Sequence, residues 1–162
     1  RQIITRPDKL SSDSASSESA WLHAIDEIEK DGEIVDLVIG MQPTSPIRHI
    51  SDIEKSIELF IREGYDSILS VSRAADRFIW QLNDGKPEAL NYDFKNRKMR
   101  QKIKETFIEN GSFYLFKPSF LKQHNNRLAG KIGFFELEYF KMFQTDEIED
   151  VRFCEMIMRE YL

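Results

Sequence analysis

One short stretch with two prolines, residues 42–48, is rich in polar side chains. It reads Gln-Pro-Thr-Ser-Pro-Ile-Arg. The stretch follows an apolar run, residues 34–41, and precedes a segment with helical spacing. This order predicts a buried strand, a turn held by two prolines and then a helix. Ligands of open α/β sheets bind at the carboxyl ends of strands, where such a turn would lie. An amide, hydroxyls and a guanidinium suit a polar ligand there, although a rigid strand-to-helix connector also explains the prolines.

A second group of candidate residues is the acidic run 146–150, Asp-Glu-Ile-Glu-Asp, just before the last helical segment. Carboxylates at this position can cap the helix, because a helix N-terminus carries partial positive charge. They can also bind Mg²⁺, which takes one or two carboxylates together with substrate phosphates. The spacing leaves both interpretations open.

The other reactive side chains show no catalytic pattern. Three histidines, His23, His49 and His124, lack the spacing of metal ligands, and Cys154 falls on the apolar face of the last helix. A single cysteine excludes an internal disulfide and a multi-thiolate zinc site. The sequence contains no Gly-rich phosphate loop of either common type.

Composition indicates one globular domain, residues 1–162, with 41% hydrophobic and 31% charged residues. The net charge of −5 disfavours nonspecific nucleic-acid binding, which needs a basic surface. No apolar run approaches the length of a membrane span, and no secretory signal pattern is present. We therefore expect a cytoplasmic protein with no membrane and no nucleic-acid partner.

The first half of the chain predicts alternating helices and strands. Apolar residues at helical spacing predict a helix that begins after the Ser-rich segment 7–19 and ends at Asp31-Gly32. Strand 34–41 follows, and Ser51 with Glu54 forms a capping box for a second helix that ends at Gly64. A second strand covers 66–72. Strand, helix and strand in this order favour an α/β fold with a parallel sheet.

The second half predicts a change of architecture. Residues 78–82 with the turn 83–85 indicate a hairpin, and the polar, basic stretch 86–106 suits a flap, a dimerisation arm or a substrate lid. Asn110-Gly111 predicts a turn before strand 112–116. A short helix from Pro118, a weak strand at 134–138 and an amphipathic C-terminal helix complete the chain. The apolar face predicted for that helix comprises Val151, Cys154, Met158 and Tyr161.

Four segments, taken in chain order, resemble the acylneuraminate cytidylyltransferase (CMP-N-acetylneuraminic acid synthetase) family. Residues 42–48 resemble its L-Q-P-T-S-P-L-R motif, and residues 6–17 resemble R-P-x-x-L-A-x-D-x-A-S-S. Residues 110–114, Asn-Gly-Ser-Phe-Tyr, resemble N-G-A-I-Y, and residues 146–150 resemble the D-E-P-E-D stretch that closes I-D-x-P-E-D. Each match is weak alone, but together they are specific and cover essentially the whole chain.

The resemblance implies a Rossmann-like nucleotide-diphospho-sugar transferase fold with a mixed, mostly parallel sheet. It also implies a protruding segment, residues 76–106, that serves as a dimerisation arm or lid, and hence a homodimer with a shared active site. The implied reaction joins CTP to a nonulosonic (sialic-type) acid, gives the CMP-sugar and releases pyrophosphate with Mg²⁺ as cofactor.

The resemblance also implies roles for individual residues. Asp146 is the metal ligand, and the other implied catalytic residues are Gln42 and Arg100. The implied substrate-binding residues are Arg6, Ser17, Gln42, Arg48, Asn110, Tyr114, Phe134 and Phe135. Among these, Gln42 would bond sugar hydroxyls, Arg6 and Ser17 would lie at the mouth of the site, and the two phenylalanines would pack on an acyl substituent.

The chain departs from the family pattern in three ways. Gln144 stands where the family usually has the first of two metal carboxylates, so that Asp146 is the better candidate, and Ile108 stands where some members carry arginine. The family's Gly/Ser/Lys-rich loop for the triphosphate has no counterpart here, so we expect this stretch alone to be inactive. Two alternatives stay open: a noncatalytic truncated paralogue that binds a sugar acid or only dimerises, and a CMP-Kdo synthetase.

Overall fold

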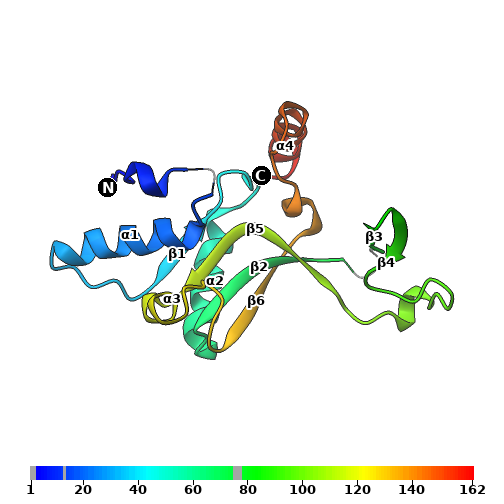
Figure 1. Cartoon of the computed structure of the whole chain (residues 1–162), viewed down its shortest axis with the longest axis horizontal. Helices are drawn as coiled ribbons and strands as arrows, with labels where there is room; N and C mark the ends of the chain where they lie inside the picture. The colour runs from blue at the N-terminus through cyan, green and yellow to red at the C-terminus, as the bar shows by residue number, and fades with distance from the viewer. Residues whose placement is uncertain (1–2, 13, 75–77) are drawn as a thin grey trace.

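A mixed four-stranded sheet forms the centre of the protein, in a computed structural model that describes residues 3–12, 14–74 and 78–162 (Figure 1). Its strand order is β1 (Val38–Met41), β5 (Phe107–Phe116), β2 (Ser67–Arg73) and β6 (Ile132–Leu137). Strand β5 runs antiparallel to both β1 and β2, whereas β6 is parallel to β2. The predicted α/β class with a mixed sheet is confirmed.

The predicted strand–helix–strand unit forms as β1, α2 (Ile50–Glu63) and β2, but its two strands are not neighbours. Strand β5 lies between them, so that in the described sheet two of the three neighbouring strand pairs are antiparallel and only β2 and β6 pair in parallel. The prediction of a mostly parallel sheet is therefore wrong for these strands. Strand β1 is also shorter than the predicted 34–41. It begins at Val38 because Val38 is paired with Phe116, the last residue of β5.

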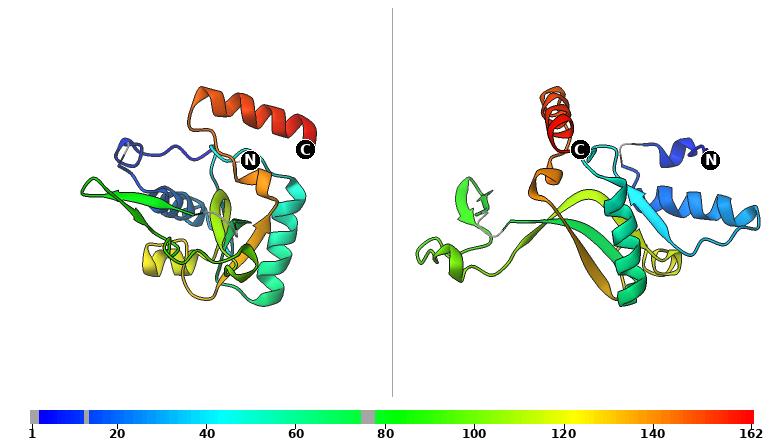
Figure 2. Two further views of the ribbon diagram at one scale, coloured as in Figure 1. Left: turned by 90° about the vertical axis from the view of Figure 1, so that its right-hand side faces the viewer. Right: turned by 180° about the vertical axis from the view of Figure 1, so that it is seen from behind.

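Helices cover both faces of the sheet (Figure 2). Helices α1 (Ser17–Lys30) and α3 (Pro118–His124) lie on one face, where Ile25 and Leu121 pack against Leu69 and Val71 of β2. Helix α2 lies on the other face, where Phe60 packs with Ile68 and with residues of β5. Strand β2 is buried from Ser67 to Ser72 because it lies between these two apolar layers.

The helix ends follow the local sequence, with two corrections. Helix α1 begins at Ser17, inside the Ser-rich segment 7–19 that was expected to precede it. The side chain of Ser16 caps α1 by accepting a hydrogen bond from the Ser19 N–H, and α2 ends at Gly64 with a φ of 63°. The predicted capping box of Ser51 and Glu54 is wrong. The helix begins earlier, at Ile50, and the carboxylate of Asp52 accepts a hydrogen bond from the backbone N–H of His49 at 2.8 Å.

The predicted turn at Asn110-Gly111 is a bulge inside β5, which continues on both sides of it. Strand β2 advances two residues from Leu69 to Val71, while β5 advances five residues from Tyr114 to Glu109. Gly111 has a φ of 68°, a backbone conformation that glycine adopts without strain. A bulge bends a strand and redirects its side chains, and this one lies directly beside the 42–48 turn.

Residues 78–106 form an arm that projects from the end of the sheet, on the right in Figure 1. The arm contains the predicted hairpin, β3 (Trp80–Asn83) and β4 (Lys86–Ala89), and a short helix, η2 (Arg100–Lys102). Its turn residues Asp84 and Gly85 both have positive φ, as a two-residue hairpin turn requires. Tyr92 packs on Phe78 with ring centroids 4.3 Å apart, so that the arm has a small aromatic core of its own.

The last helix, α4 (Ile148–Tyr161), follows η3 (Tyr139–Met142) and stands out at the top of Figure 1. Cys154 and Ile157 are buried against Ile47, which follows the Gln42 turn. The rest of the predicted apolar face is open, because Tyr161 is 62% exposed and both Val151 and Met158 are 39% exposed. Across the described ranges, no helix combines the length and apolar character needed to cross a membrane.

Candidate functional site

The turn at residues 42–48 is held in place by the side chain of Arg48. Its guanidinium donates hydrogen bonds to the carbonyl oxygens of Gln42 at 2.9 Å and Ser45 at 2.7 Å, and also to the carbonyl oxygen of Ser112 in β5. Burial lowers the pKa of Arg48. The structure therefore gives Arg48 backbone partners rather than a free guanidinium for a ligand, and its observed role is to fasten the turn to the bulge.

Asn110 is buried inside the bulge, where its amide makes three hydrogen bonds to neighbouring residues. Its Oδ1 accepts hydrogen bonds from the Ser70 hydroxyl at 2.6 Å and the Ser112 N–H at 3.1 Å, and its Nδ2 donates to the Ser72 hydroxyl at 3.0 Å. Only 1% of Asn110 is exposed. The predicted ligand residue Asn110 thus faces β2, and its observed contacts stabilise the bulge.

Three side chains from two distant segments of the chain meet over Gly111. A Cβ placed on this glycine would lie 2.4 Å from Gln42 Oε1, 3.1 Å from Ser45 Oγ and 3.3 Å from Gln144 Nε2. Ser45 and Gln144 both donate hydrogen bonds to the Asn110 carbonyl oxygen, at 3.2 and 3.1 Å. These three side chains are uncharged amides and a hydroxyl, which suit a ligand that carries hydroxyl groups.

The segment that carries Gln144 is docked on the same turn. The backbone N–H of Thr145 donates to the carbonyl oxygen of Thr44 at 2.8 Å. Further back, the buried ammonium of Lys141 lies 2.8 Å from Asp52 at the start of α2. These contacts bring residues 141–145 beside the 42–48 turn, a placement that no local sequence signal revealed.

Asp146, the predicted metal ligand, is exposed at the start of α4. Its backbone N–H and that of Glu147 both donate to one carboxylate oxygen of Asp150, at 3.1 and 2.9 Å. Part of the acidic run therefore caps the helix, as the first interpretation predicted. Among the described residues, no group of three or more His, Cys, Asp and Glu side chains could hold a metal ion.

Tyr114 lies on the α1 side of the sheet, within a charged and aromatic cluster. Its hydroxyl donates to Glu109 Oε1 at 2.5 Å, and the Arg127 guanidinium lies 4.3 Å from its ring centroid. Arg127 also contacts the ring of Trp21 and forms an ion pair with Glu18 at 2.8 Å. Burial, together with the hydrogen bond to Glu109, raises the pKa of Tyr114 to about 12, so that the phenol stays protonated at neutral pH.

Phe134 and Phe135 do not line one site. Neighbouring residues of a strand point to opposite faces, and here Phe135 packs on Phe113 on the α2 side, whereas Phe134 packs on Phe107 on the α1 side. Phe134 is 52% exposed. The expectation that both rings pack on one acyl substituent is therefore wrong, and Phe134 is the ring that faces the same side as Tyr114.

Of the other predicted site residues, Ser17 and Arg6 are described by the structure, but the side chain of Arg100 is not. Ser17 is the first residue of α1 and is exposed, and Arg6 is exposed in the extended segment before η1 (Asp8–Leu10). The side chain of Arg100 lies outside the described part of the structure.

Of the predicted site residues, the structure brings Gln42, Arg48 and Asn110 together at one junction. It adds Ser45, Gly111 and Gln144. Ser45 and Gly111 lie within the two motifs that resemble the family, and Gln144 stands at the position of a family metal carboxylate, but none of the three was predicted as a site residue.

No protein-family model matches the chain. It is 32% identical over 141 residues to N-acylneuraminate cytidylyltransferase A of Danio rerio, an alignment that covers 85% of this chain and 31% of that protein. It is 31% identical over 140 residues to N-acylneuraminate cytidylyltransferase of Oncorhynchus mykiss, with 84% and 31% covered. It is also 26% identical over 128 residues to post-translational flagellin modification protein B of Campylobacter coli, with 77% and 54% covered. The chain spans about a third of the length of the two fish relatives.

Proposed function

The chain is a distant homologue of the N-acylneuraminate cytidylyltransferases, and on this basis we propose that it forms part of an enzyme that joins CTP to a nonulosonic acid. The reaction gives a CMP-activated sugar acid and releases pyrophosphate. The observation that carries the proposal is the junction over Gly111, where the side chains of Gln42, Ser45 and Gln144 meet at the carboxyl end of β1. Ligands of α/β sheets bind at this edge.

In this proposal, the residues of the chain contribute to catalysis mainly by binding and orienting the substrates. The anomeric hydroxyl of the sugar acid attacks the α-phosphate in line, so that catalysis rests on orientation and on stabilisation of charge at phosphate oxygens. Gln42 holds sugar hydroxyls through its amide, and Arg48 holds Gln42 by fastening the turn. Phe134 offers an exposed ring to an acyl substituent. Arg100 faces the sugar carboxylate, and Arg6 and Ser17 lie at the entrance.

Magnesium is the proposed cofactor, and the residues present fit it in a limited way. Mg²⁺ uses one or two protein carboxylates and completes its shell with water and substrate phosphates. Asp146 is exposed beside Thr145, which is docked on the turn. The side-chain amide of Gln144 donates a hydrogen bond to the Asn110 carbonyl oxygen. The set therefore fits an ion held chiefly by phosphates with Asp146 as one protein ligand, and bound magnesium would neutralise charge on those phosphates.

The arm of residues 76–106 is proposed as the dimerisation segment. Support comes from its described apolar side chains, since Leu82 is 75% exposed and Phe94 and Leu90 are also largely open. Such side chains on a projecting element suit burial against a second copy of the chain. The resemblance to the family further implies that the two subunits would share the active site.

The proposal is tested by incubating the intact natural protein with CTP, Mg²⁺ and N-acetylneuraminic, legionaminic or pseudaminic acid. Pyrophosphate release with one of them is the expected result, and no release with any of them would contradict the enzyme assignment. Calorimetry with CTP and each sugar acid separately distinguishes the alternatives. Sugar-acid binding without turnover would support the noncatalytic paralogue, and turnover with Kdo instead would support the CMP-Kdo synthetase.

The metal assignment has its own variants. In the active protein, Asp146→Ala is expected to lower turnover steeply, because it removes the carboxylate proposed to bind Mg²⁺. Glu149→Ala in the same acidic run is the matched control and is expected to act mildly. Small and equal effects of both substitutions would mean that the run only caps α4.

A further inference from the structure

A cavity of about 330 Å³ lies in the arm, and we call it the arm pocket. Pockets that take small ligands measure roughly 300–1,000 Å³, so this one is large enough for a small molecule. None of the residues described as lining it belongs to the junction over Gly111, and the side chains proposed for the dimer contact, Leu82, Leu90 and Phe94, are not among them either. The residues that define the pocket here are Phe78, Tyr92, Ile103, Lys98, Lys102 and Lys104.

The apolar wall of the arm pocket is formed by packed aromatic rings. The ring centroid of Tyr92 lies 4.3 Å from that of Phe78, and Trp80 packs on Tyr92 with centroids 5.9 Å apart. The Arg97 guanidinium lies 4.3 Å from the Phe78 centroid. Phe78, Tyr92 and Ile103 are each half-buried, so that part of the wall is open to a ligand. Such a wall suits a flat ring, because bases stack on aromatic side chains.

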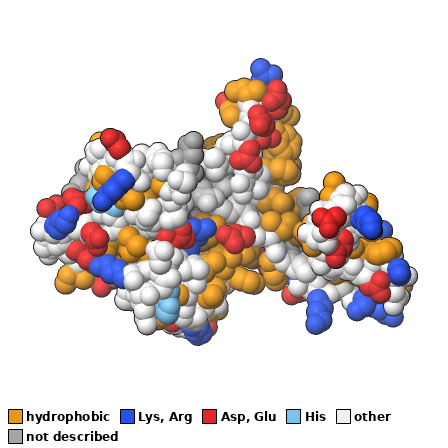
Figure 3. Space-filling view, viewed as in Figure 1, with side chains coloured by type: hydrophobic (Ala, Val, Ile, Leu, Met, Phe, Trp, Pro, Cys, Tyr) orange, Lys and Arg blue, Asp and Glu red, His pale blue; other side chains and the backbone are white. Residues whose placement is uncertain are grey.

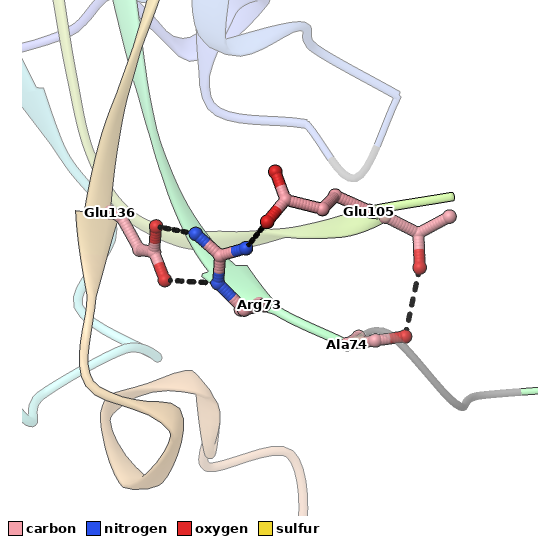
Figure 4. A network of polar contacts seen from close by, with 5 residues as sticks. Arg73, Ala74, Glu105 and Glu136 are labelled. Atoms are coloured by element: carbon pink, nitrogen blue, oxygen red, sulfur yellow. Dashed lines mark hydrogen bonds and ion pairs between the residues drawn. The ribbon is translucent and has the colours of Figure 1, made fainter. Parts of the chain in front are cut away.

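Hydrogen bonds at the end of the sheet hold the inner edge of the pocket (Figure 4). Thr106 lines the pocket, and its hydroxyl donates to the Ala74 carbonyl oxygen at 2.9 Å, while the Ala74 N–H donates to the Thr106 carbonyl oxygen at 2.9 Å. Beside Thr106, Glu105 accepts a hydrogen bond from Arg73 at the end of β2, and Arg73 also donates to both oxygens of Glu136. The pocket is therefore anchored to the end of β2.

Positive charge is concentrated around the pocket. Residues 78–106 contain seven Lys and Arg against four Asp and Glu, a net charge of +3 in a chain whose net charge is −5. Figure 3 shows Lys and Arg side chains gathered on the arm, at the right of the view. Within the described ranges, the three pocket lysines form no ion pair, and Glu105, next to Lys104, is paired with Arg73 instead. Asp93 also lines the pocket, so that three ammonium groups stand against one carboxylate. An anionic ligand complements this charge.

We propose that the arm pocket is a second ligand site, which binds a nucleoside phosphate. The base packs on the aromatic wall of Phe78 and Tyr92, and the phosphate is held by the three pocket lysines, whose ammonium groups act as point charges for phosphate. An uncharged nucleoside would use only the aromatic wall, and inorganic phosphate would use only the lysines. The site uses none of the residues proposed for the reaction at the junction, so this inference does not rest on the proposed function.

The test is methyl NMR of the intact natural protein with labelled isoleucine side chains, titrated with CMP, cytidine and inorganic phosphate. The Ile103 methyl group reports on the arm pocket, and that of Ile47, which is buried in the 42–48 turn, reports on the junction. CMP is expected to shift the Ile103 signal in a saturable way. Cytidine and inorganic phosphate are each expected to bind there about tenfold or more weakly, because each lacks one half of the contact.

Two double variants separate the pocket from general attraction by a basic arm. Lys102→Ala/Lys104→Ala removes two pocket lysines and is expected to weaken the CMP effect on Ile103 about tenfold or more. Lys86→Ala/Lys95→Ala is the matched control, because both lysines are exposed in the same arm and neither is among the described lining residues. The control is expected to bind CMP as the wild type does. An unchanged Ile79 methyl signal shows that the arm keeps its fold in both variants.

The outcomes distinguish this inference from the proposed function. An Ile103 signal that does not respond to CMP would overturn the inference, and so would equal weakening in the two double variants. A shift of Ile103 with N-acetylneuraminic acid but not with CMP would also overturn it, since the pocket would then take a sugar acid. A response of Ile47 alone would place the nucleotide at the junction and not in the arm. Failure of the pyrophosphate assay would contradict the proposed function and leave this inference standing.

Discussion

The buried ammonium of Lys141 lies 2.8 and 3.0 Å from the two carboxylate oxygens of Asp52. Only 1% of Lys141 is exposed, and its third partner is Glu138 at 2.8 Å. Burial alone would lower the pKa of Lys141, but hydrogen bonds with Asp52 and Glu138 outweigh it and raise the pKa. Lys141 therefore stays protonated at neutral pH. Its contact with Asp52 joins η3 to the start of α2.

Removal of one partner from this pair is expected to destabilise the protein strongly. Lys141→Met leaves the Asp52 carboxylate buried without its cation, at a cost of about 3–5 kcal/mol in the free energy of unfolding. The double variant Lys141→Met/Asp52→Leu is expected to recover much of the loss, because no buried unpaired charge remains and the Glu138 side chain is exposed. Urea unfolding of the single and double variants measures this, and additive losses in the double variant would show that the two groups do not interact.

Gly111→Ala is expected to disturb the junction more than an equivalent change elsewhere. The substitution places a methyl group 2.4 Å from Gln42 Oε1 at a φ of 68°. Gly64→Ala at the end of α2 is the matched control, since its φ is 63° and no atom lies within 4 Å of the added Cβ. Both variants bear a backbone penalty of about 1 kcal/mol. Only Gly111→Ala is expected to weaken sugar-acid binding as well, and equal behaviour of the two would argue against a role for the junction.

Asp66 is expected to contribute to stability in a pH-dependent way. Hydrogen bonds from Lys117 Nζ and the Lys131 N–H, at 2.6 and 2.8 Å, lower the pKa of Asp66. A lowered pKa means that the stabilisation is present above the ordinary aspartate range and is lost as pH falls through the lowered value. The difference in unfolding free energy between wild type and Asp66→Asn is therefore expected to be constant from about pH 7 to 5 and to shrink below about pH 4.

The control for this pH series is Asp36→Asn, because Asp36 is exposed in the connection before β1. It is expected to differ little from the wild type at every pH. A wild-type advantage over Asp66→Asn that persists undiminished into the acid range would show that the ionised carboxylate of Asp66 is not the source of the stabilisation.

The oligomeric state tests the proposed role of the arm. Leu82 in β3 is 75% exposed, and a buried charge there is incompatible with an apolar contact. Leu82→Asp is expected to convert a dimer into a monomer in light scattering after size exclusion. Ile61→Asp, at a 71% exposed position on α2, is the matched control and is expected to remain dimeric. A wild-type protein that is monomeric at high concentration would refute the proposed arm contact.

Local signals predicted most of the elements but not their arrangement. Gly64 and the Asp84-Gly85 turn mark element ends that the structure reproduces, because positive φ depends on adjacent residues. The position of β5 between β1 and β2 depends on contacts far apart in sequence. The Asn110-Gly111 signal was ambiguous for the same reason, since a turn and a bulge need the same backbone freedom.

The candidate site shows the same difference between what local sequence predicts and what only the tertiary structure decides. The sequence alone determined that an amide, hydroxyls and a guanidinium follow a strand at residues 42–48, because strand and proline patterns are local. Only the tertiary structure decided their roles. Arg48 is held by three backbone carbonyls, Asn110 is enclosed by Ser70 and Ser72, and Gln144 reaches the bulge through the docking of Thr145. Each outcome depends on which chain segments meet, and hydrogen-bond partners drawn from distant segments leave no periodic trace in the sequence.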